Sequence, residues 1–298
     1  MKIIQSKDMR QKKIRSITLW GVLVNVVLIT LKLIVGIGIR SSALIADGVH
    51  SMSDLATDFV VLIGTKLSHR PPDESHPYGH SKFETIASQL IALFLFATSL
   101  GLIWSAGISI YNHKHNFPGY WVLIVAVFSV LAKEVLFFLT RKIARATQST
   151  VLYANAWHHR SDSFSSVAVL IGGIVSILGW GYADQVASIV VGFMIMTVAG
   201  KIFYEGLVEL SEHSADHKSI KTIEAVLSEE KDIFHWHALR TRKLGAELCV
   251  DVHILVDSNL SVLESHRITM EIEEKIKERL SHPVNILIHI EPHVEEML

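Results

Sequence analysis

Two short patterns in the sequence combine a histidine with an aspartate four residues later: His50-Ser-Met-Ser-Asp54 and His158-His-Arg-Ser-Asp162. On an α-helix this spacing places both side chains on one face, with Cβ atoms about 5–6 Å apart. Each pair could therefore hold a cation. Two such helices packed face to face would offer two imidazole nitrogens and two carboxylate oxygens, which suit a tetrahedral divalent ion such as Zn²⁺. We predict that the four residues form one metal site.

Other polar residues lie on or beside the same helix faces. Asp47 and Asp58 flank the first pair at helical spacing, and Asn155 precedes the second. We predict that these three orient the metal-binding imidazoles or line the path of the ion; alternatively, they only face a polar gap between helices. His159 is rotated by about 100° from His158 and is expected at a surface or interface. Arg160 is expected to extend its stem to a water-filled edge.

Both patterns lie in long apolar stretches. Half of the 298 residues are hydrophobic, and a membrane-spanning helix needs about 20 apolar residues. Six stretches meet this requirement: residues 16–39, 42–67, 84–111, 119–140, 150–178 and 183–207. An aspartate at the centre of a spanning helix costs roughly 2.5–3.5 kcal/mol, so the repeated His/Asp pairs indicate a function rather than an accident of composition.

Charge predicts the orientation of the spans. Lysine and arginine are frequent in the N-terminal tail and in the second and fourth connections, and rare in the alternate connections. This bias predicts a multi-pass protein of the cell (inner) membrane with both termini in the cytoplasm. The net charge of −1 argues against nucleic acid as a partner. A single cysteine, Cys249, excludes an intrachain disulfide.

The composition changes near residue 211, which divides the chain into a six-helix transmembrane domain (1–210) and a domain of soluble composition (211–298). In the second part the pattern predicts a helix at 218–230, strands at 236–243 and 246–256, a helix at 261–279 and a strand at 284–291. The order α-β-β-α-β fits a two-layer α+β domain with both helices on one face of a three-stranded sheet.

The loop after the second span could hold another ion. Asp73, His76 and His80 lie within eight residues of a segment bent by prolines and a glycine. Three such side chains are enough to bind a metal ion, although an ordinary polar loop can have the same composition.

Histidines also cluster in the last part of the chain. Strand alternation places Asp251 with His253, and His289 with Glu291, on single strand faces. Aligned neighbouring strands would then gather a His/carboxylate cluster on one sheet surface. Cys249 could join this cluster or be a small buried hydrophobe.

Taken together, these motifs resemble the cation diffusion facilitator family over nearly the whole chain. The matching segments are His50-x-x-x-Asp54, Ala156-Trp-His158-x-x-Ser-Asp162, Asp73-x-x-His76-x-x-Gly-His80, Leu239-Arg-Thr-Arg242 and Ile288-His-x-Glu-Pro292. The resemblance implies six transmembrane helices, a metallochaperone-like (ferredoxin-like) cytoplasmic domain, and a homodimer that exports divalent metal cations in exchange for protons. It also implies a transport site at His50, Asp54, His158 and Asp162, a loop site at Asp73, His76 and His80, and regulatory cytoplasmic sites at His237, His253, His266, His289 and Glu291.

Zn²⁺ is the predicted cargo, because imidazole favours zinc over the harder manganese. Fe²⁺, Co²⁺, Cd²⁺ and Mn²⁺ are the alternatives, with the metal acting as substrate and regulator. We predict a transporter rather than an enzyme. A membrane zinc hydrolase is the first rival, but the chain has no His-Glu-x-x-His motif and four protein ligands leave no open position for water. A metal sensor with a membrane anchor is the second, and it gives no reason for paired charges in two spans.

Overall fold

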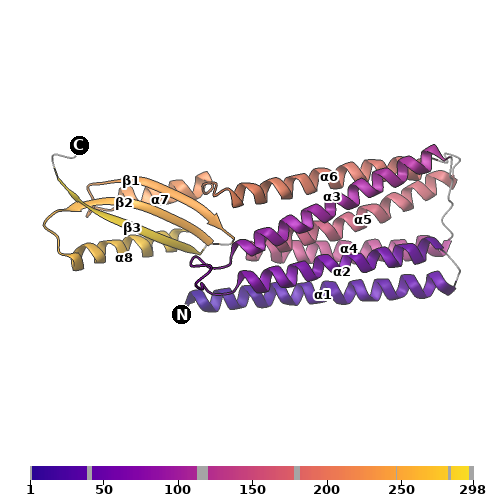
Figure 1. The fold of residues 1–298 in the computed structure, drawn as a ribbon, viewed down its shortest axis with the longest axis horizontal. Helices are drawn as coiled ribbons and strands as arrows, with labels where there is room; N and C mark the ends of the chain where they lie inside the picture. Colours follow the sequence, from indigo (N-terminus) through magenta and orange to yellow (C-terminus); the bar gives the residue numbers. More distant parts are fainter. Residues whose placement is uncertain are drawn as a thin grey trace. The chain divides into compact units, whose positions relative to one another are not determined.

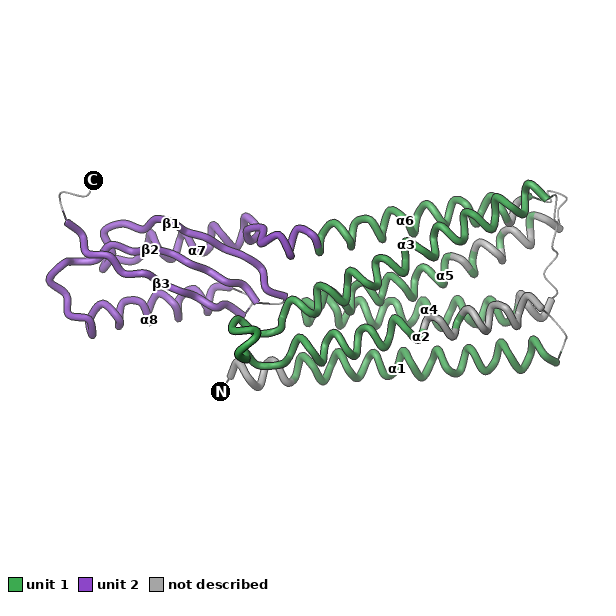
Figure 2. The backbone as a smooth tube through the Cα atoms, viewed as in Figure 1, with its two compact units in different colours: residues 1–206 green, residues 207–298 purple. Residues whose placement is uncertain are grey.

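The computed structural model describes residues 2–38, 42–112, 120–177, 182–245, 247–280 and 283–294, with side chains described throughout these ranges except at 2–8, 42–50, 52–54, 120–123, 165, 168–170, 172–174, 176–177 and 183–184. The chain divides into two compact units, residues 1–206 and 207–298 (Figure 2).

The first unit is built from long helices (Figure 1): α1 (Lys2–Gly38), α2 (Ser42–Ser68), α3 (Lys82–Tyr111), α4 (Tyr120–Thr147), α5 (Thr150–Ile177) and α6 (Ala183–Leu210). Each overlaps one of the six predicted spans over nearly its whole length; residues 39, 119 and 178 of the predictions lie outside the described residues. α1 begins well before the predicted residue 16 and α4 continues past residue 140. Both extensions carry charged residues, so these two helices extend beyond the apolar stretches that were used to predict them.

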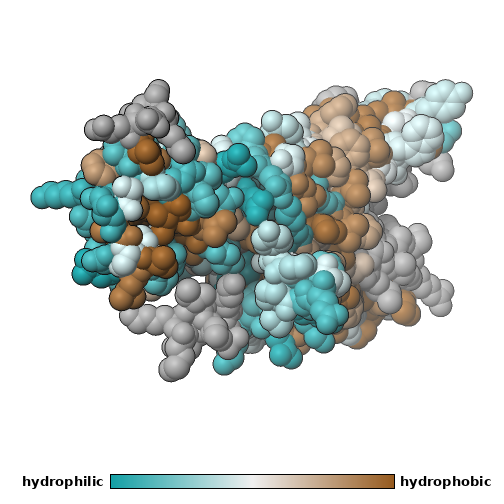
Figure 3. Space-filling model, turned by 60° about the vertical axis from the view of Figure 1, so that its left-hand side comes forward, coloured by the Kyte–Doolittle hydropathy of each residue, from teal (hydrophilic) through white to brown (hydrophobic). Residues whose placement is uncertain are grey.

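Three helical segments are apolar enough to cross a membrane on composition alone, among the described residues: Met9–Gly38, Lys82–Tyr111 and Gln185–Leu210. The remaining long helices, α2, α4 and α5, carry charged residues within their predicted spans, including Asp58, Lys133 and Asp162. Large apolar side chains are exposed on the outside of the bundle (Figure 3), among them Trp20, Leu131 and Phe193. Such a surface suits contact with lipid.

One part of the bundle interior is an apolar core. Ile14, Val61, Ile91, Leu95 and Leu152 belong to one buried cluster contributed by α1, α2, α3 and α5. α4 and α5 pack along much of their length. Their turn is tight, and it contains Gln148 at φ 50°.

The second unit contains α7 (His217–Glu229), β1 (His235–Leu244), β2 (Glu247–Asp257), α8 (Val262–Arg279) and β3 (Val284–His293). The predicted order α-β-β-α-β is confirmed. Asp216 caps α7, and Ser261 with Glu264 forms a capping box at the start of α8, so each helix begins where a side-chain oxygen satisfies a free backbone N–H.

The sheet order is β1-β2-β3, with β1 antiparallel and β3 parallel to β2. Val252 and Ile254 of β2 share a core with Ile268 and Ile272 of α8. His253 has the opposite strand parity and is only half-buried. One face of the sheet therefore packs on the helices, and the other presents polar side chains.

Candidate metal centres

The second His/Asp pair lies on α5, inside the helical unit. His158 is buried, and its Nε2 lies 3.9 Å from Oδ2 of Asp162, whose side chain is 18% exposed. The helix thus brings both side chains to one face, as their spacing predicts. On the neighbouring helix α4, the buried Lys133 donates from Nζ to the same Asp162 oxygen at 2.7 Å.

A second polar group surrounds Asp58 of α2, which is fully buried. Its Oδ2 accepts a hydrogen bond of 2.8 Å from Asn25 of α1, and its Oδ1 accepts one of 2.9 Å from Asn155 of α5. His159 Nε2 lies 3.9 Å from Asp58 Oδ1 and 3.3 Å from the Asn155 amide. These four residues, the Asp58 cluster, tie three helices together.

The first His/Asp pair is only partly covered by the structure. α2 is continuous through residues 47–58, but the side chains of Asp47, His50 and Asp54 lie outside the described residues. The predicted convergence of the two pairs therefore stays a prediction.

His159 was expected at a surface or an interface. It is 1% exposed and faces Asp58 of α2, so it lies between helices and not at a surface. The guanidinium of Arg160 lies 4.3 Å from the centre of the Phe137 ring, and its Nε lies 3.6 Å from Glu134 Oε1. α4 supplies both partners. A flat guanidinium packs well on aromatic rings, which the sequence of α5 alone does not reveal.

The loop residues Asp73, His76 and His80 come together as predicted, with ligand atoms within 4.8 Å of one another. His80 Nε2 lies 3.3 Å from Asp73 Oδ2, and His76 Nδ1 lies 3.5 Å from Asp73 Oδ1. His80 is buried against Phe83. Gly79 makes the turn between the two histidines at φ 85°, a conformation that favours glycine.

The carboxylate of Asp73 is held in its ionised form by the loop. Its Oδ1 accepts hydrogen bonds from the hydroxyl and backbone N–H of Ser75 and from the backbone N–H of His76. These bonds, that of the Ser75 hydroxyl first, lower the pKa of Asp73 to about 2. A carboxylate that is ionised before metal arrives is a better ligand, since no proton must leave.

A third cluster lies on the open face of the sheet. The register aligns His237 with His253 and His253 with His289 across the three strands. Glu291 Oε1 lies 2.8 Å from His253 Nδ1, and Oε2 lies 3.4 Å from His237 Nε2. The hydrogen bond with His253, and then the nearby histidines, lower the pKa of Glu291. We call His237, His253, His289 and Glu291 the sheet cluster.

The predicted cytoplasmic metal ligands differ in how close they lie to Glu291 and in how exposed they are. His289 is the most exposed member, with Nε2 3.7 Å from Glu291 Oε1. His266 is exposed on α8, and α8 packs on the opposite face of the sheet, so a single chain does not bring it to the cluster. Cys249 is buried and interacts with Arg242 instead; burial raises the pKa of its thiol.

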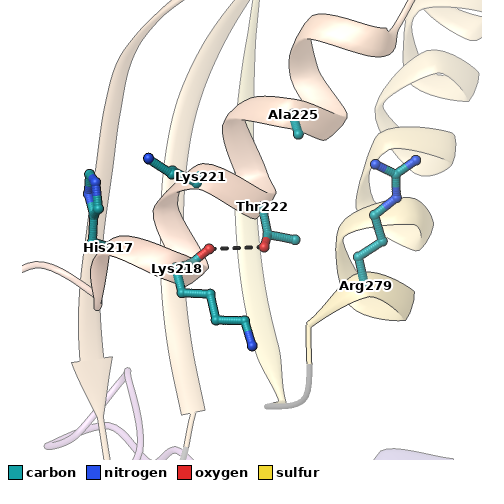
Figure 4. Close-up of a pocket in the computed structure, with 6 residues that line it drawn as sticks. All are labelled: His217, Lys218, Lys221, Thr222, Ala225 and Arg279. Atoms are coloured by element: carbon teal, nitrogen blue, oxygen red, sulfur yellow. Dashed lines mark hydrogen bonds between the residues drawn. The ribbon is translucent and has the colours of Figure 1, made fainter.

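A cavity of about 630 Å³ on the helical layer of the second unit does not fit a metal ion. Lysine and arginine side chains from α7 and α8 dominate its lining (Figure 4). His217 is the only imidazole in this lining, and no carboxylate accompanies it.

Three residues of the intramembrane centres were missed in the sequence: Asn25, Lys133 and the inward-facing His159. Lys133 gave a usable signal, because a lysine within the apolar stretch 119–140 needs a partner. Asn25 gave no specific signal in the sequence, since a single amide in a spanning helix has many explanations.

Comparison with known proteins gives matches for both units. Residues 18–211 match the model of the cation efflux transmembrane domain, and residues 215–293 match that of the cation efflux protein cytoplasmic domain. An uncharacterized transporter of Methanocaldococcus jannaschii is 33% identical over 90% of this chain and 94% of its own length. The manganese efflux system protein MneP of Bacillus subtilis is 30% identical over 96% of this chain and 99% of its own length.

A solved structure matches the second unit. The metal-bound C-terminal domain of the CzcD transporter from Thermotoga maritima is 29% identical, covering 26% of this chain and 93% of that chain, with a TM-score of 0.25.

Proposed function

Because the chain belongs to the cation efflux family of membrane transporters, we propose that it exports Zn²⁺ from the cytoplasm by proton-coupled alternating access. The cargo would bind at His50, Asp54, His158 and Asp162. The observation that carries this proposal is the buried His158/Asp162 pair, because ionisable groups inside a membrane bundle mark ion paths.

Helix geometry supports the convergence of the four residues. Consecutive helices of the bundle run in opposite directions (Figure 1), so α2 and α5 are antiparallel. The hydrogen bond between Asp58 and Asn155 fixes one level at which they meet. One turn further, about 5.4 Å along both helices, Asp54 comes to the level of His158 and His159. The His50/Asp54 pair is therefore expected at nearly the same level along the helix axes as the His158/Asp162 pair.

Coupling to protons would follow from shared atoms. A metal ion needs the lone pairs of neutral imidazole and ionised carboxylate, so protons compete with it for the same nitrogens and oxygens. Protons arriving from outside would expel the metal, and the exchange would be an antiport.

The two outer clusters would serve the transport site. The loop site on the cytoplasmic side, at Asp73, His76 and His80, would deliver ions. The sheet cluster would sense metal, with His266 of a second copy completing a bridge in a homodimer. Metal bound there would favour one conformation of the transporter.

Transport in proteoliposomes tests this proposal. The parental protein is expected to carry Zn²⁺ against an imposed pH gradient, and Asp162→Ala is expected to abolish flux. Glu205→Gln, which alters an exposed ion pair on α6, is the matched control and should retain it. Parental flux in a folded, dimeric Asp162→Ala protein would refute the site assignment.

Manganese is the second candidate cargo, because MneP of Bacillus subtilis is named for manganese efflux. The two imidazoles favour zinc instead. Uptake measured metal by metal, with equal free concentrations of Zn²⁺, Mn²⁺, Fe²⁺, Co²⁺ and Cd²⁺, separates the candidates.

A further inference from the structure

The oxygen of Asp162 that faces His158 is occupied by a lysine. Lys133 Nζ donates to Asp162 Oδ2 at 2.7 Å, and the same oxygen lies 3.9 Å from His158 Nε2. Bonds of about 2.0–2.1 Å to a tetrahedral Zn²⁺ would bring the imidazole nitrogen and the carboxylate oxygen to about 3.3 Å. The two ligand atoms are thus near the separation that metal binding requires, with an ammonium group on one of them.

This ammonium and a metal ion cannot both hold that oxygen. Two cations a few ångströms apart in a bundle of low dielectric repel each other strongly. Metal binding at Asp162 therefore requires Lys133 to move away. A lysine suits this movement, because its charge lies at the end of a flexible four-carbon stem.

The α4–α5 contact has other supports besides this ion pair. The rings of Phe137 and Trp157 lie 5.5 Å apart, and Arg160 of α5 packs over Phe137 of α4. Leu136 and Ala156 are also buried on these helices. The Lys133–Asp162 pair is therefore one of several contacts that join these two helices.

We propose that Lys133 is an internal cation that occupies the Asp162 carboxylate in the metal-free transporter and is displaced by the incoming metal. Lys133 is a positioning residue in this scheme. It neutralises the Asp162 carboxylate while the metal-free transporter returns to the conformation that faces the cytoplasm. Because it competes with the metal for the same oxygen, it also weakens metal binding and speeds metal release. The inference rests on the proposed function, since it deepens the role of the same site.

Lys133→Met tests the inference, with Zn²⁺ as the probe in proteoliposomes of the full-length protein. Without a competing cation the site should hold Zn²⁺ more tightly, so KM should fall about tenfold and kcat should fall about tenfold because release slows. A merely structural role would lower kcat without lowering KM. Lys133→Arg keeps the charge and should retain a KM near the parental value. Ser129→Ala, one turn away on α4 and also buried, should behave as the parent.

The outcomes are decisive. If Lys133→Met does not form a stable dimer, Lys133→Gln takes its place with the same expected result. A KM at or above the parental value in the folded variant refutes the inference. Failure of both uncharged variants to fold, while Lys133→Arg folds, assigns the pair a structural role and also refutes it. A parental protein that carries none of the tested metals overturns the proposed function instead.

Discussion

At the scale of single residues, the proposed loop site depends on the ionised carboxylate of Asp73. Because its pKa is lowered to about 2 from an ordinary 3.8, its ionised form stabilises the folded loop above pH 3.8. That contribution is lost as the pH falls from 3.8 through about 2. Protonation of Asp73 therefore does not limit metal binding between pH 3.8 and neutral pH.

Asp73→Asn should remove one bound metal ion per protomer at neutral pH, because the amide loses the charge that His76 and His80 face. Equilibrium dialysis with Zn²⁺ on the full-length protein measures this. Ser75→Ala, which removes one hydrogen bond but keeps the carboxylate, should retain the ion. Equal stoichiometry in the parent and Asp73→Asn would exclude a loop site.

Glu291 is the carboxylate of the sheet cluster, and its pKa is lowered by the bond with His253. Glu291→Gln should weaken zinc binding at the sheet by more than tenfold, since charge-assisted contacts are about twice as strong as neutral ones. Competition with a fluorescent chelator checks it. Glu271→Gln, on the surface of α8, is the control and should change nothing.

The sequence predicted which residue types could bind metal but not all of their neighbours. The i, i+4 spacing was enough to place His158 beside Asp162, because both lie on one helix. The facing of His159 toward Asp58, and of Lys133 toward Asp162, depends on how separate helices are rotated against one another. No local pattern in a single chain specifies that rotation.

At the scale of elements, Arg10 fastens one end of the helical bundle. Its Nη2 bonds both oxygens of the buried Glu84 of α3, at 2.9 and 2.8 Å, and its Nε donates to the carbonyl of Thr147 at the end of α4. One guanidinium therefore joins α1 to two other helices. Bonding from two differently directed nitrogens, Nε and Nη2, is a property of the rigid guanidinium of arginine.

Arg10→Met should destabilise the helical unit by about 3–5 kcal/mol, because it leaves the Glu84 carboxylate buried without its partner. Arg10→Lys should restore only part of this loss, since a single ammonium group replaces the two nitrogens that reach Glu84 and the Thr147 carbonyl. Thermal unfolding in detergent measures both. Lys12→Met, an exposed change in the same segment, is the control; equal melting temperatures for all four proteins would contradict the assignment.

Gly64 of α2 allows close contact with α3. A Cβ at this position would lie 2.4 Å from Cβ of Ala87, so Gly64→Ala should force the helices apart and destabilise the protein by about 1–3 kcal/mol. Gly101 of α3 has no atom within 4 Å of such a Cβ. Gly101→Ala should leave the melting temperature unchanged or raise it slightly, since alanine is the better helix former. A reversed order of the two variants would refute the packing argument.

The elements themselves were largely predictable. The length of the apolar stretches and the periodicity of the last part predicted the helices and strands of the described residues to within a few residues, apart from the charged extensions of α1 and α4. Strand order and register were not predictable, because they depend on long-range pairing. It is this register that puts His237, His253 and His289 in one row.

At the scale of the whole molecule, the second unit has a core of its own. Ile223 and Leu227 of α7 pack with strand and helix residues such as Ile254 and Ile272. The described residues of this unit therefore form a hydrophobic core without side chains of the helical bundle.

The direction of transport depends on which side of the membrane each connection occupies. α3 contains 30 residues, which is about 45 Å of helix and more than the roughly 30 Å hydrocarbon core. Ser75, shortly before α3, and Tyr111, at its end, are both exposed and should lie on opposite sides. The excess of lysine and arginine near Ser75 predicts that its side is the cytoplasm.

Single cysteines test this orientation in a Cys249→Ser background, which removes the one native thiol. In intact cells a membrane-impermeant maleimide should label Tyr111→Cys and leave Ser75→Cys unlabelled; in inverted vesicles the order should reverse. The variant at Ser75 keeps Asp73, His76 and His80, so flux can be measured in the same vesicles. Labelling of Ser75→Cys from outside would place the loop site on the external face. A metal ion collected there would enter the cell, and export would be refuted together with the orientation.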